Sequence, residues 1–165
     1  LVFKDYQCIG YHGTEKEKAD VIIASKKFIE SNSGKDWLGK GVYFFEDDIQ
    51  QAINFVSKAR KVESYKIIKA NIKSNKWLDL IKVENYSELQ VIAEELEKRN
   101  LSILKKYKLN NAVIIDFMYK IEKFDVVSAV FEYNNKRIKN SNIMPMQIQI
   151  CVKNMDCIFD IQGVD

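Results

Sequence analysis

The sequence has 165 residues, of which 47% are hydrophobic and 30% charged, and this length predicts one domain with a hydrophobic core of ordinary size. One proline and six glycines exclude collagen-like and linker-rich classes, and a net charge of +3 is too small to indicate nucleic-acid binding by itself. No apolar run approaches the roughly 18 residues of a membrane span, so we expect a soluble, cytoplasmic protein that does not bind membranes. The three cysteines lack a C-x-x-C spacing, which favours reduced thiols over a zinc or redox site.

Local patterns in the first half of the chain predict three strands and two helices. In chain order we expect a strand over 3–11, a helix over 15–27, a loop over 31–36, a strand over 41–45, a helix over 48–61 and a strand over 65–73. The first strand should end at Gly13, because glycine breaks a pleated strand. Thr14 and Glu17 then form a capping-box pattern for the helix that follows.

The second half of the chain predicts a helical block followed by three strands. The helices are expected from residue 87 and over about 110–121, and the strands over 126–133, 146–152 and 157–161. Strands thus occupy both ends of the chain and helices the middle, which indicates an α+β fold rather than an alternating α/β fold. We expect a single domain over 1–165 with a helical insertion at about 85–121.

One segment comes close to a phosphate-binding loop. Residues 34–41 almost spell G-x-x-x-x-G-K-[ST], but Gly41 stands where the motif needs a hydroxyl. A polar loop precedes the segment and a strand-like run follows it, whereas the motif needs a strand before it and a helix after it. We therefore reject a P-loop, and the lack of a G-x-G-x-x-G after a strand leaves a Rossmann site unsupported.

His12 is the only histidine in the chain, which removes two-histidine metal sites, and we expect no metal. A histidine at a strand end, followed by glycine and a hydroxyl residue, suits the rim of a pocket that a ligand approaches closely. Taken alone, His12 is also explained as a structural histidine and Tyr43 as a core aromatic. In that interpretation the chain is an unrelated α+β interaction domain.

The combination of motifs resembles the ADP-ribosyltransferases. The chain has Tyr-His-Gly-Thr at 11–14, then Gly-Lys-Gly-Val-Tyr-Phe-Phe at 39–45, then a helix from Asp48 that carries Ala52 and Phe55. It is similar in particular to the diphtheria-toxin and poly(ADP-ribose) polymerase branch, in which a His-Gly-Thr strand and a Gly-x-Gly-hydrophobic-Tyr strand line the NAD cleft. The resemblance implies a split antiparallel β-sheet core around an NAD cleft, with peripheral helices.

The third motif of that branch is a late strand that carries a glutamate. The resemblance covers residues 8–56 and 125–153, and Met146–Val152 matches this strand by position. It contains no glutamate, so Gln149, or Gln147 as the alternative, would fill the role. Because the glutamate is missing, polymer formation is not expected.

The resemblance also implies a role for each site residue. The backbone of Gly13 would bind the carboxamide of nicotinamide, Tyr43 would stack on the nicotinamide ring, and His12 would hydrogen-bond the adenosine ribose. Gln149 would hold the hydroxyls of the nicotinamide ribose, although a neutral amide cannot act as a general base. The expected NAD-binding residues are His12, Gly13, Thr14, Tyr43 and Phe55, and the expected catalytic residues are Gln149, Tyr43 and His12.

The function implied by the resemblance is mono-ADP-ribosylation. NAD would be the co-substrate, a protein or nucleic acid the acceptor, and nicotinamide the leaving group. The family's habits and the small size of the chain add the expectation of a bacterial toxin or defence effector, with an antitoxin or inhibitor protein as partner. The alternative is a catalytically silent module of the same fold that binds NAD or ADP-ribose.

Two basic segments are candidates for acceptor recognition. By analogy with the family, the loop from Glu132 to Pro145 would read the acceptor, and a solvated hairpin is its alternative interpretation. Lys105, Lys106 and Lys108 are better explained as cations at a helix end, where they suit the helix dipole, than as a recognition patch.

Overall fold

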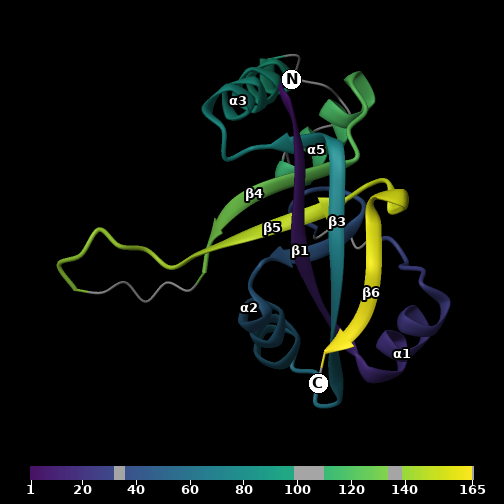
Figure 1. Ribbon diagram of the computed structural model, residues 1–165. Helices are drawn as coiled ribbons and strands as arrows, with labels where there is room; N and C mark the ends of the chain where they lie inside the picture. The colour runs from purple at the N-terminus through teal and green to yellow at the C-terminus, as the bar shows by residue number, and fades with distance from the viewer. Residues whose placement is uncertain (32–35, 99–109, 134–138, 165) are drawn as a thin grey trace.

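The structure is a computed structural model that describes residues 1–31, 36–98, 110–133 and 139–164 (Figure 1). In chain order it contains β1 (Phe3–Glu15), α1 (Lys16–Ser25), β2 (Val42–Glu46), α2 (Ile49–Asn54), the π-helical turn η1 (Phe55–Ala59), β3 (Tyr65–Asp79), α3 (Val83–Lys98), α5 (Asn111–Ile121), β4 (Val126–Glu132), β5 (Met146–Val152), the 3-10 turn η2 (Met155–Cys157) and β6 (Ile158–Val164). Helices coexist with one six-stranded sheet, as the α+β class requires.

The strand pairings close on themselves. The order is β1-β2-β5-β4-β3-β6, and β1 also pairs with β3, so five strands form a ring. Strand β6 pairs with the edge of β3 opposite β1. Figure 1 shows β1, β3 and β6 running together, with β4 and β5 crossing them. Among the recorded pairings β3–β4 is the parallel one, and helices α3 and α5 make its crossover.

Alternate side chains of β2 and β5 point to two different faces of the sheet. Val42 and Phe44 of β2 lie with Ile150 and Val152 of β5 in the largest buried cluster, together with Trp77 of β3. Because side chains alternate between the faces of a strand, Tyr43 and Phe45 point to the opposite face, as do Gln149 and Cys151, their partners across the ladder. The second face is the one that carries the candidate site residues of β2 and β5.

Helices α2, α3 and α5 cover the second face of the strands, whereas α1 packs Ala19 into the largest buried cluster. Helix α2 and the turn η1 lie against β1 and β2, where Ala52 of α2 and Val56 of η1 are fully buried beside Phe45. Helices α3 and α5 pack against each other over the end of the sheet, in a cluster that includes Leu96 and Met118. These two helices fall within the region expected as a helical insertion. The apolar spacing of α5 explains its packing, and Asn110 begins the helix by accepting from Val113 N at 3.1 Å.

Several expected boundaries were wrong at Gly13 and beyond. Strand β1 does not end there, because its ladder with β3 continues to Glu15. Helix α1 therefore begins at Lys16 and ends at Ser25 instead of 27, and the capping-box prediction is wrong, since Thr14 lies inside the strand and the helix start has no side-chain cap. Strand β3 is longer than expected for the same reason, as its long ladder with β1 holds it extended to Asp79.

Other expected boundaries moved by smaller steps. The helix expected over 48–61 is a short α-helix followed by the wider π-turn η1. The helix expected from 87 begins at Val83, and the strand expected over 157–161 runs from Ile158 to Val164. The prediction for Met146–Val152 was confirmed in full.

Within the described ranges, no helix combines the length and the apolar composition needed to cross a membrane. All three cysteines are buried free thiols. Burial raises the pKa of Cys151 to about 12 and that of Cys157 to about 11, and it raises the pKa of Cys8 further, so each thiol is protonated at neutral pH. Lys105, Lys106 and Lys108 lie outside the described residues, as do residues 32–35 and 134–138.

Candidate functional site

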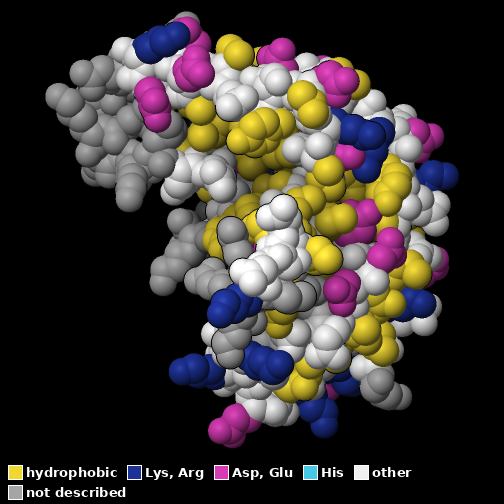
Figure 2. Space-filling model, turned by 90° about the vertical axis from the view of Figure 1, so that its left-hand side faces the viewer, with side chains coloured by type: hydrophobic (Ala, Val, Ile, Leu, Met, Phe, Trp, Pro, Cys, Tyr) yellow, Lys and Arg dark blue, Asp and Glu magenta, His cyan; other side chains and the backbone are white. Residues whose placement is uncertain are grey.

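A cavity of about 780 Å³ opens where β1, β2, β5 and α2 meet. Its wall includes residues 11–13 of β1, 42–45 of β2, Gln147 and Gln149 of β5, one side of α2 and η1, and parts of the loop that precedes β2. On the face from which the β4–β5 hairpin projects, hydrophobic side chains gather near the centre (Figure 2). Apart from Thr14, every expected NAD-binding or catalytic residue lines the cavity, and so does the alternative Gln147.

Strands β1 and β2 separate beside Gly13. Their pairing ends at Tyr11 and Phe45. Lys16 N donates to Ser64 O and so continues the β1–β3 ladder, which shows that the peptide groups of Lys16 point toward β3. Along an antiparallel strand the peptide groups of successive residues point alternately to one neighbouring strand and to the other. The N–H and C=O of Gly13 therefore point away from β3. No described strand pairs with Gly13 on that side, so both peptide groups are free to bind a ligand.

Gly13 also lets α2 approach β1 closely. A Cβ atom at this position would lie 2.7 Å from the main-chain oxygen of Ala52 and 3.0 Å from the Cβ of Val56. Any larger residue would push the helix away from the strand. The glycine therefore serves two purposes, since it brings α2 to the strand and leaves its own peptide groups uncovered.

His12 bridges the gap between the two strands. Its Nδ1 lies 2.8 Å from the main-chain oxygen of Tyr43, and because a carbonyl only accepts, Nδ1 carries the proton. The ring also meets Phe28 edge-on, with the centroids 5.4 Å apart. Burial lowers the pKa of His12 against the opposing effect of the carbonyl. The imidazole is thus neutral at pH 7, and its Nε2 is an acceptor.

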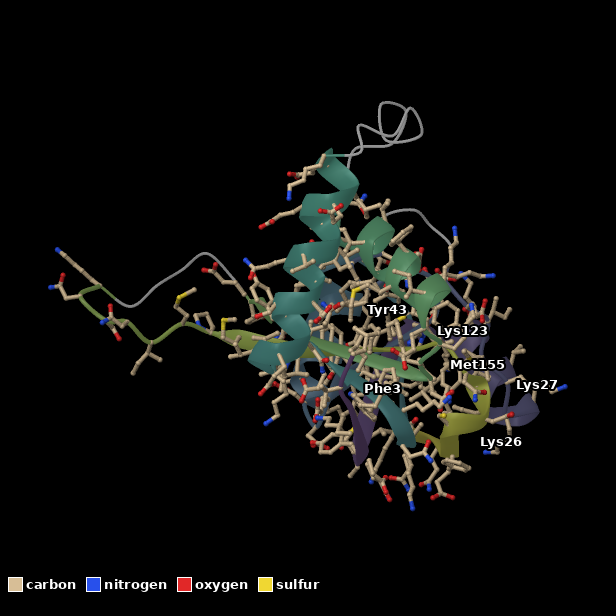
Figure 3. All side chains as sticks on the ribbon, turned by 90° about the horizontal axis from the view of Figure 1, so that it is seen from above. Phe3, Lys26, Lys27, Tyr43, Lys123 and Met155 are labelled. Atoms are coloured by element: carbon tan, nitrogen blue, oxygen red, sulfur yellow. The ribbon has the colours of Figure 1, made fainter. Side chains whose placement is uncertain are left out.

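The hydroxyl of Tyr43 forms its hydrogen bonds within the protein. It donates to Gly39 O at 2.6 Å and accepts from Leu38 N at 2.9 Å. Burial raises the pKa of Tyr43, which excludes it as a general base at neutral pH. In Figure 3 Tyr43 lies toward the centre of the molecule, whereas Lys27 projects from its edge. The ring is therefore what Tyr43 can offer to a ligand.

The loop before β2 is held in place by a buried lysine. Lys153 Nζ donates to Leu38 O at 3.0 Å and to Lys40 O at 2.7 Å, and it also lies 3.5 Å from Asp116 Oδ1 of α5. Gly39 adopts a φ of +76°, and a Cβ there would collide with the Asp116 carboxylate. This is the physical reason for a glycine at this position of the Gly-Lys-Gly sequence.

Strand β5 places two glutamines on the cavity. Gln149 lies opposite Phe45 of β2 and Ala129 of β4, and Gln147 lies opposite Phe131. Both line the cavity, and neither side-chain amide has a recorded hydrogen bond within the described ranges. The structure therefore brings both alternatives for the third motif to the same site.

One side of α2 and η1 completes the wall. Four residues on this side line the cavity and follow one another at helical steps of three and four positions: Gln51, Asn54, Phe55 and Lys58. Phe55 is 42% exposed, and its ring centroid lies 5.8 Å from that of Phe45. The turn η1 is closed by Arg60 N donating to Phe55 O at 2.9 Å, a π-type bond of the kind often found at functional sites.

Sequence reasoning found Phe55 but missed its polar neighbours. Gln51, Asn54 and Lys58 resemble the solvated side of an amphipathic helix, and their spacing alone could have marked them. Arg60 also lines the cavity, 3.7 Å from Glu15. Thr14 was expected at the site, but it is buried in β1 and does not line the cavity. The reason is the continuation of β1, which pairs Thr14 with Lys66.

The comparisons with known proteins add one relative. The chain is 28% identical over 186 residues to a protein of Methanocaldococcus jannaschii named "Uncharacterized protein MJ0359", a match that covers 94% of this chain and 86% of the relative. No protein-family model and no solved structure matches the chain.

Proposed function

We propose that the protein is a mono-ADP-ribosyltransferase that transfers ADP-ribose from NAD to a macromolecular acceptor and releases nicotinamide. The observation that carries the proposal is the split between β1 and β2, where the free peptide groups of Gly13 face a cavity walled by Tyr43 and Phe55. Its volume of about 780 Å³ is that of a small-molecule site, which typically measures about 300–1,000 Å³. In this proposal the split sheet is an ADP-ribosyltransferase-like core.

The nicotinamide end of NAD binds at Gly13. The N–H of Gly13 donates to the carboxamide oxygen, and its C=O accepts from the carboxamide nitrogen. The pyridinium ring stacks on the aromatic wall of Tyr43 and Phe55, where each aromatic contact contributes about 0.5–1.5 kcal/mol beyond burial. Both rings line the cavity, and the Tyr43 hydroxyl bonds hold that ring still.

The remainder of NAD meets complementary groups on β1 and η1. The neutral His12 accepts a hydrogen bond from a hydroxyl of the adenosine ribose through Nε2, since Nδ1 is bound to Tyr43 O. Lys58 and Arg60 carry positive charge along the same wall and balance the negative charge of the diphosphate.

Transfer breaks the bond between C1′ of the ribose and the pyridinium nitrogen. The electron pair of this bond leaves with nicotinamide, C1′ develops oxocarbenium character, and a nucleophilic atom of the acceptor bonds to C1′ and loses its proton. Gln149 orients the ribose hydroxyls through its amide. Since a neutral amide neither takes the proton nor supplies full negative charge, the proton passes to solvent or to the acceptor itself.

A second candidate function is a silent NAD-binding or ADP-ribose-binding module of the same fold. It is favoured by the glutamines at both cavity-facing positions of β5, because neither can replace the charge of a glutamate. The interaction-domain interpretation, in which His12 and Tyr43 are core residues, predicts no saturable binding of NAD. A toxin or defence role in the cytoplasm, with an antitoxin or inhibitor protein as partner, belongs to the transferase proposal.

Two measurements separate these functions. Calorimetry with NAD should give saturable heat for the wild type, and none for Gly13→Ala, whose methyl group displaces α2. Gly163→Ala is the matched control, because the added Cβ there meets the flexible side chains of Ile23 and Lys66. No binding to the wild type overturns both NAD-dependent functions.

The second measurement follows the ADP-ribose group. The protein is incubated with a cell lysate and NAD labelled in its adenylate half, and the labelled macromolecules are treated with protease or nuclease. Label removed by protease alone identifies a protein acceptor, and label removed by nuclease alone a nucleic acid. Saturable binding without nicotinamide release or transferred label supports the silent module.

A further inference from the structure

The side-chain amide of Gln51 contains a buried hydrogen-bond acceptor that is not satisfied by the described residues. Its Oε1 is buried and has no hydrogen-bond partner among the described residues, and the residue as a whole is 9% exposed. Buried polar atoms in folded proteins almost always have a partner, so an orphaned acceptor calls for a donor that the apoprotein does not supply. The backbone at this position is itself well fixed, since Gln51 N donates to the capping Asp48 side chain at 3.2 Å.

The location of Gln51 identifies the donor. Gln51 lines the cavity on the same side of the helix as Phe55, one turn away. The next residue, Ala52, has its main-chain oxygen 2.7 Å from where a Cβ of Gly13 would stand. The helical turn that carries Gln51 thus lies directly against the strand residue with free peptide groups, and next to an aromatic ring.

We propose that Gln51 is a specificity-determining residue that accepts an N–H from the carboxamide of nicotinamide. This inference rests on the proposed function. A carboxamide offers one acceptor and two N–H donors, whereas the peptide of Gly13 provides one donor and one acceptor. The second carboxamide N–H is left over, and Gln51 Oε1 is the acceptor that completes the set.

The same geometry rejects close analogues of the carboxamide. A carboxylate in its place would set its oxygens against two acceptors, the Gly13 carbonyl and Gln51 Oε1. A methyl ketone would leave both acceptors without a donor. A site built around hydrogen-bonding groups discriminates strongly against analogues that leave those groups unpaired. The chain therefore selects NAD over its nicotinic acid and acetylpyridine forms.

The test combines ligand and side-chain changes. Calorimetric titrations compare NAD with 3-acetylpyridine adenine dinucleotide and with nicotinic acid adenine dinucleotide, using the wild type and Gln51→Met. Methionine keeps the length of the side chain but lacks the acceptor. Gln90→Met, at an exposed glutamine of α3 that does not line the cavity, is the matched control.

Wild type and Gln90→Met should bind NAD more than tenfold more tightly than the acetylpyridine form, because that form leaves two acceptors unpaired and one hydrogen bond in a buried site is worth about tenfold. Gln51→Met should bind NAD about tenfold more weakly and the acetylpyridine form unchanged, so that the preference shrinks about tenfold to the part set by the Gly13 carbonyl. Gln51→Glu, which retains an acceptor, should retain the preference and reject the nicotinic acid form more strongly. Equal weakening of NAD and the acetylpyridine form by Gln51→Met would assign Oε1 to another part of NAD and overturn the inference.

A thermal melt of the apoprotein distinguishes this role from a structural one. Gln51→Met should melt at or above the temperature of the wild type, because the substitution removes an unpaired buried acceptor. A lower melting temperature together with an unchanged preference among the three dinucleotides would make Gln51 a structural residue and refute the proposal. If the wild type binds none of the dinucleotides, the proposed function fails first.

Discussion

His12 donates its Nδ1–H to the main-chain oxygen of Tyr43 at 2.8 Å, and this bond joins the two strands beyond the point where their ladder ends. A side chain thus takes the place of a backbone donor in the gap. The arrangement opens the sheet beside Gly13 without leaving the Tyr43 carbonyl unsatisfied. The two sequence motifs are physically linked by this bond.

The pH dependence of stability should report on His12. Burial lowers its folded-state pKa below the ordinary 6.5, so the unfolded chain binds this proton more readily. The contribution of neutral His12 to the free energy of unfolding is therefore fully present above pH 6.5, and it is lost as the pH falls through the folded-state pKa. Urea unfolding of wild type and His12→Phe between pH 5 and pH 8 measures it, because the chain has one histidine. A difference in unfolding free energy between the two proteins that is constant with pH would contradict the assignment.

Tyr43→Phe separates the hydroxyl from the ring. Loss of the hydroxyl leaves Leu38 N and Gly39 O without this partner and should lower the unfolding free energy by about 1–3 kcal/mol. Binding of NAD should be largely retained, since the ring remains, whereas Tyr43→Ala should weaken it strongly. The hydroxyl would instead contact the substrate if Tyr43→Phe abolished turnover while unfolding was unchanged.

The third catalytic position is decided by a pair of variants on β5. Gln149→Ala should slow nicotinamide release strongly, because the amide orients the ribose whose C1′ reacts, and Gln147→Ala should have the smaller effect. Single-turnover release of nicotinamide at saturating NAD is the appropriate readout. The reverse order of effects would move the assignment to Gln147, which faces the same cavity.

Lys153→Met tests whether the loop before β2 positions Tyr43. The lysine side chain is 4% exposed and donates to the carbonyls of Leu38 and Lys40. Removing it takes the charged donor away from both carbonyls, which should lower the free energy of unfolding by about 1–3 kcal/mol and raise the Kd for NAD. Lys27→Met, at the exposed edge, is the control and should change neither quantity. Unaltered NAD binding in a destabilised Lys153→Met would limit the lysine to a structural role.

Local patterns in the sequence predicted elements where neighbours along the chain decide the structure. Met146–Val152 alternates and forms β5 over the same residues, and the helix expected over about 110–121 is α5 at Asn111–Ile121. The prediction failed at Gly13 and Thr14, where a glycine and a capping pattern indicated a strand end. The β1–β3 ladder, formed with residues more than fifty positions away, keeps them extended instead.

By itself, the sequence determined the α+β class and the grouping of His12, Gly13 and Tyr43 as candidate site residues, because periodicity and short motifs are properties of adjacent residues. Only the tertiary structure decided that Gln51 belongs with them. On an isolated helix it would be an ordinary solvated side chain. The close approach of α2 to Gly13, which requires the absence of a Cβ, brings the helical turn of Gln51 to the cavity wall, where its buried Oε1 has no partner among the described residues.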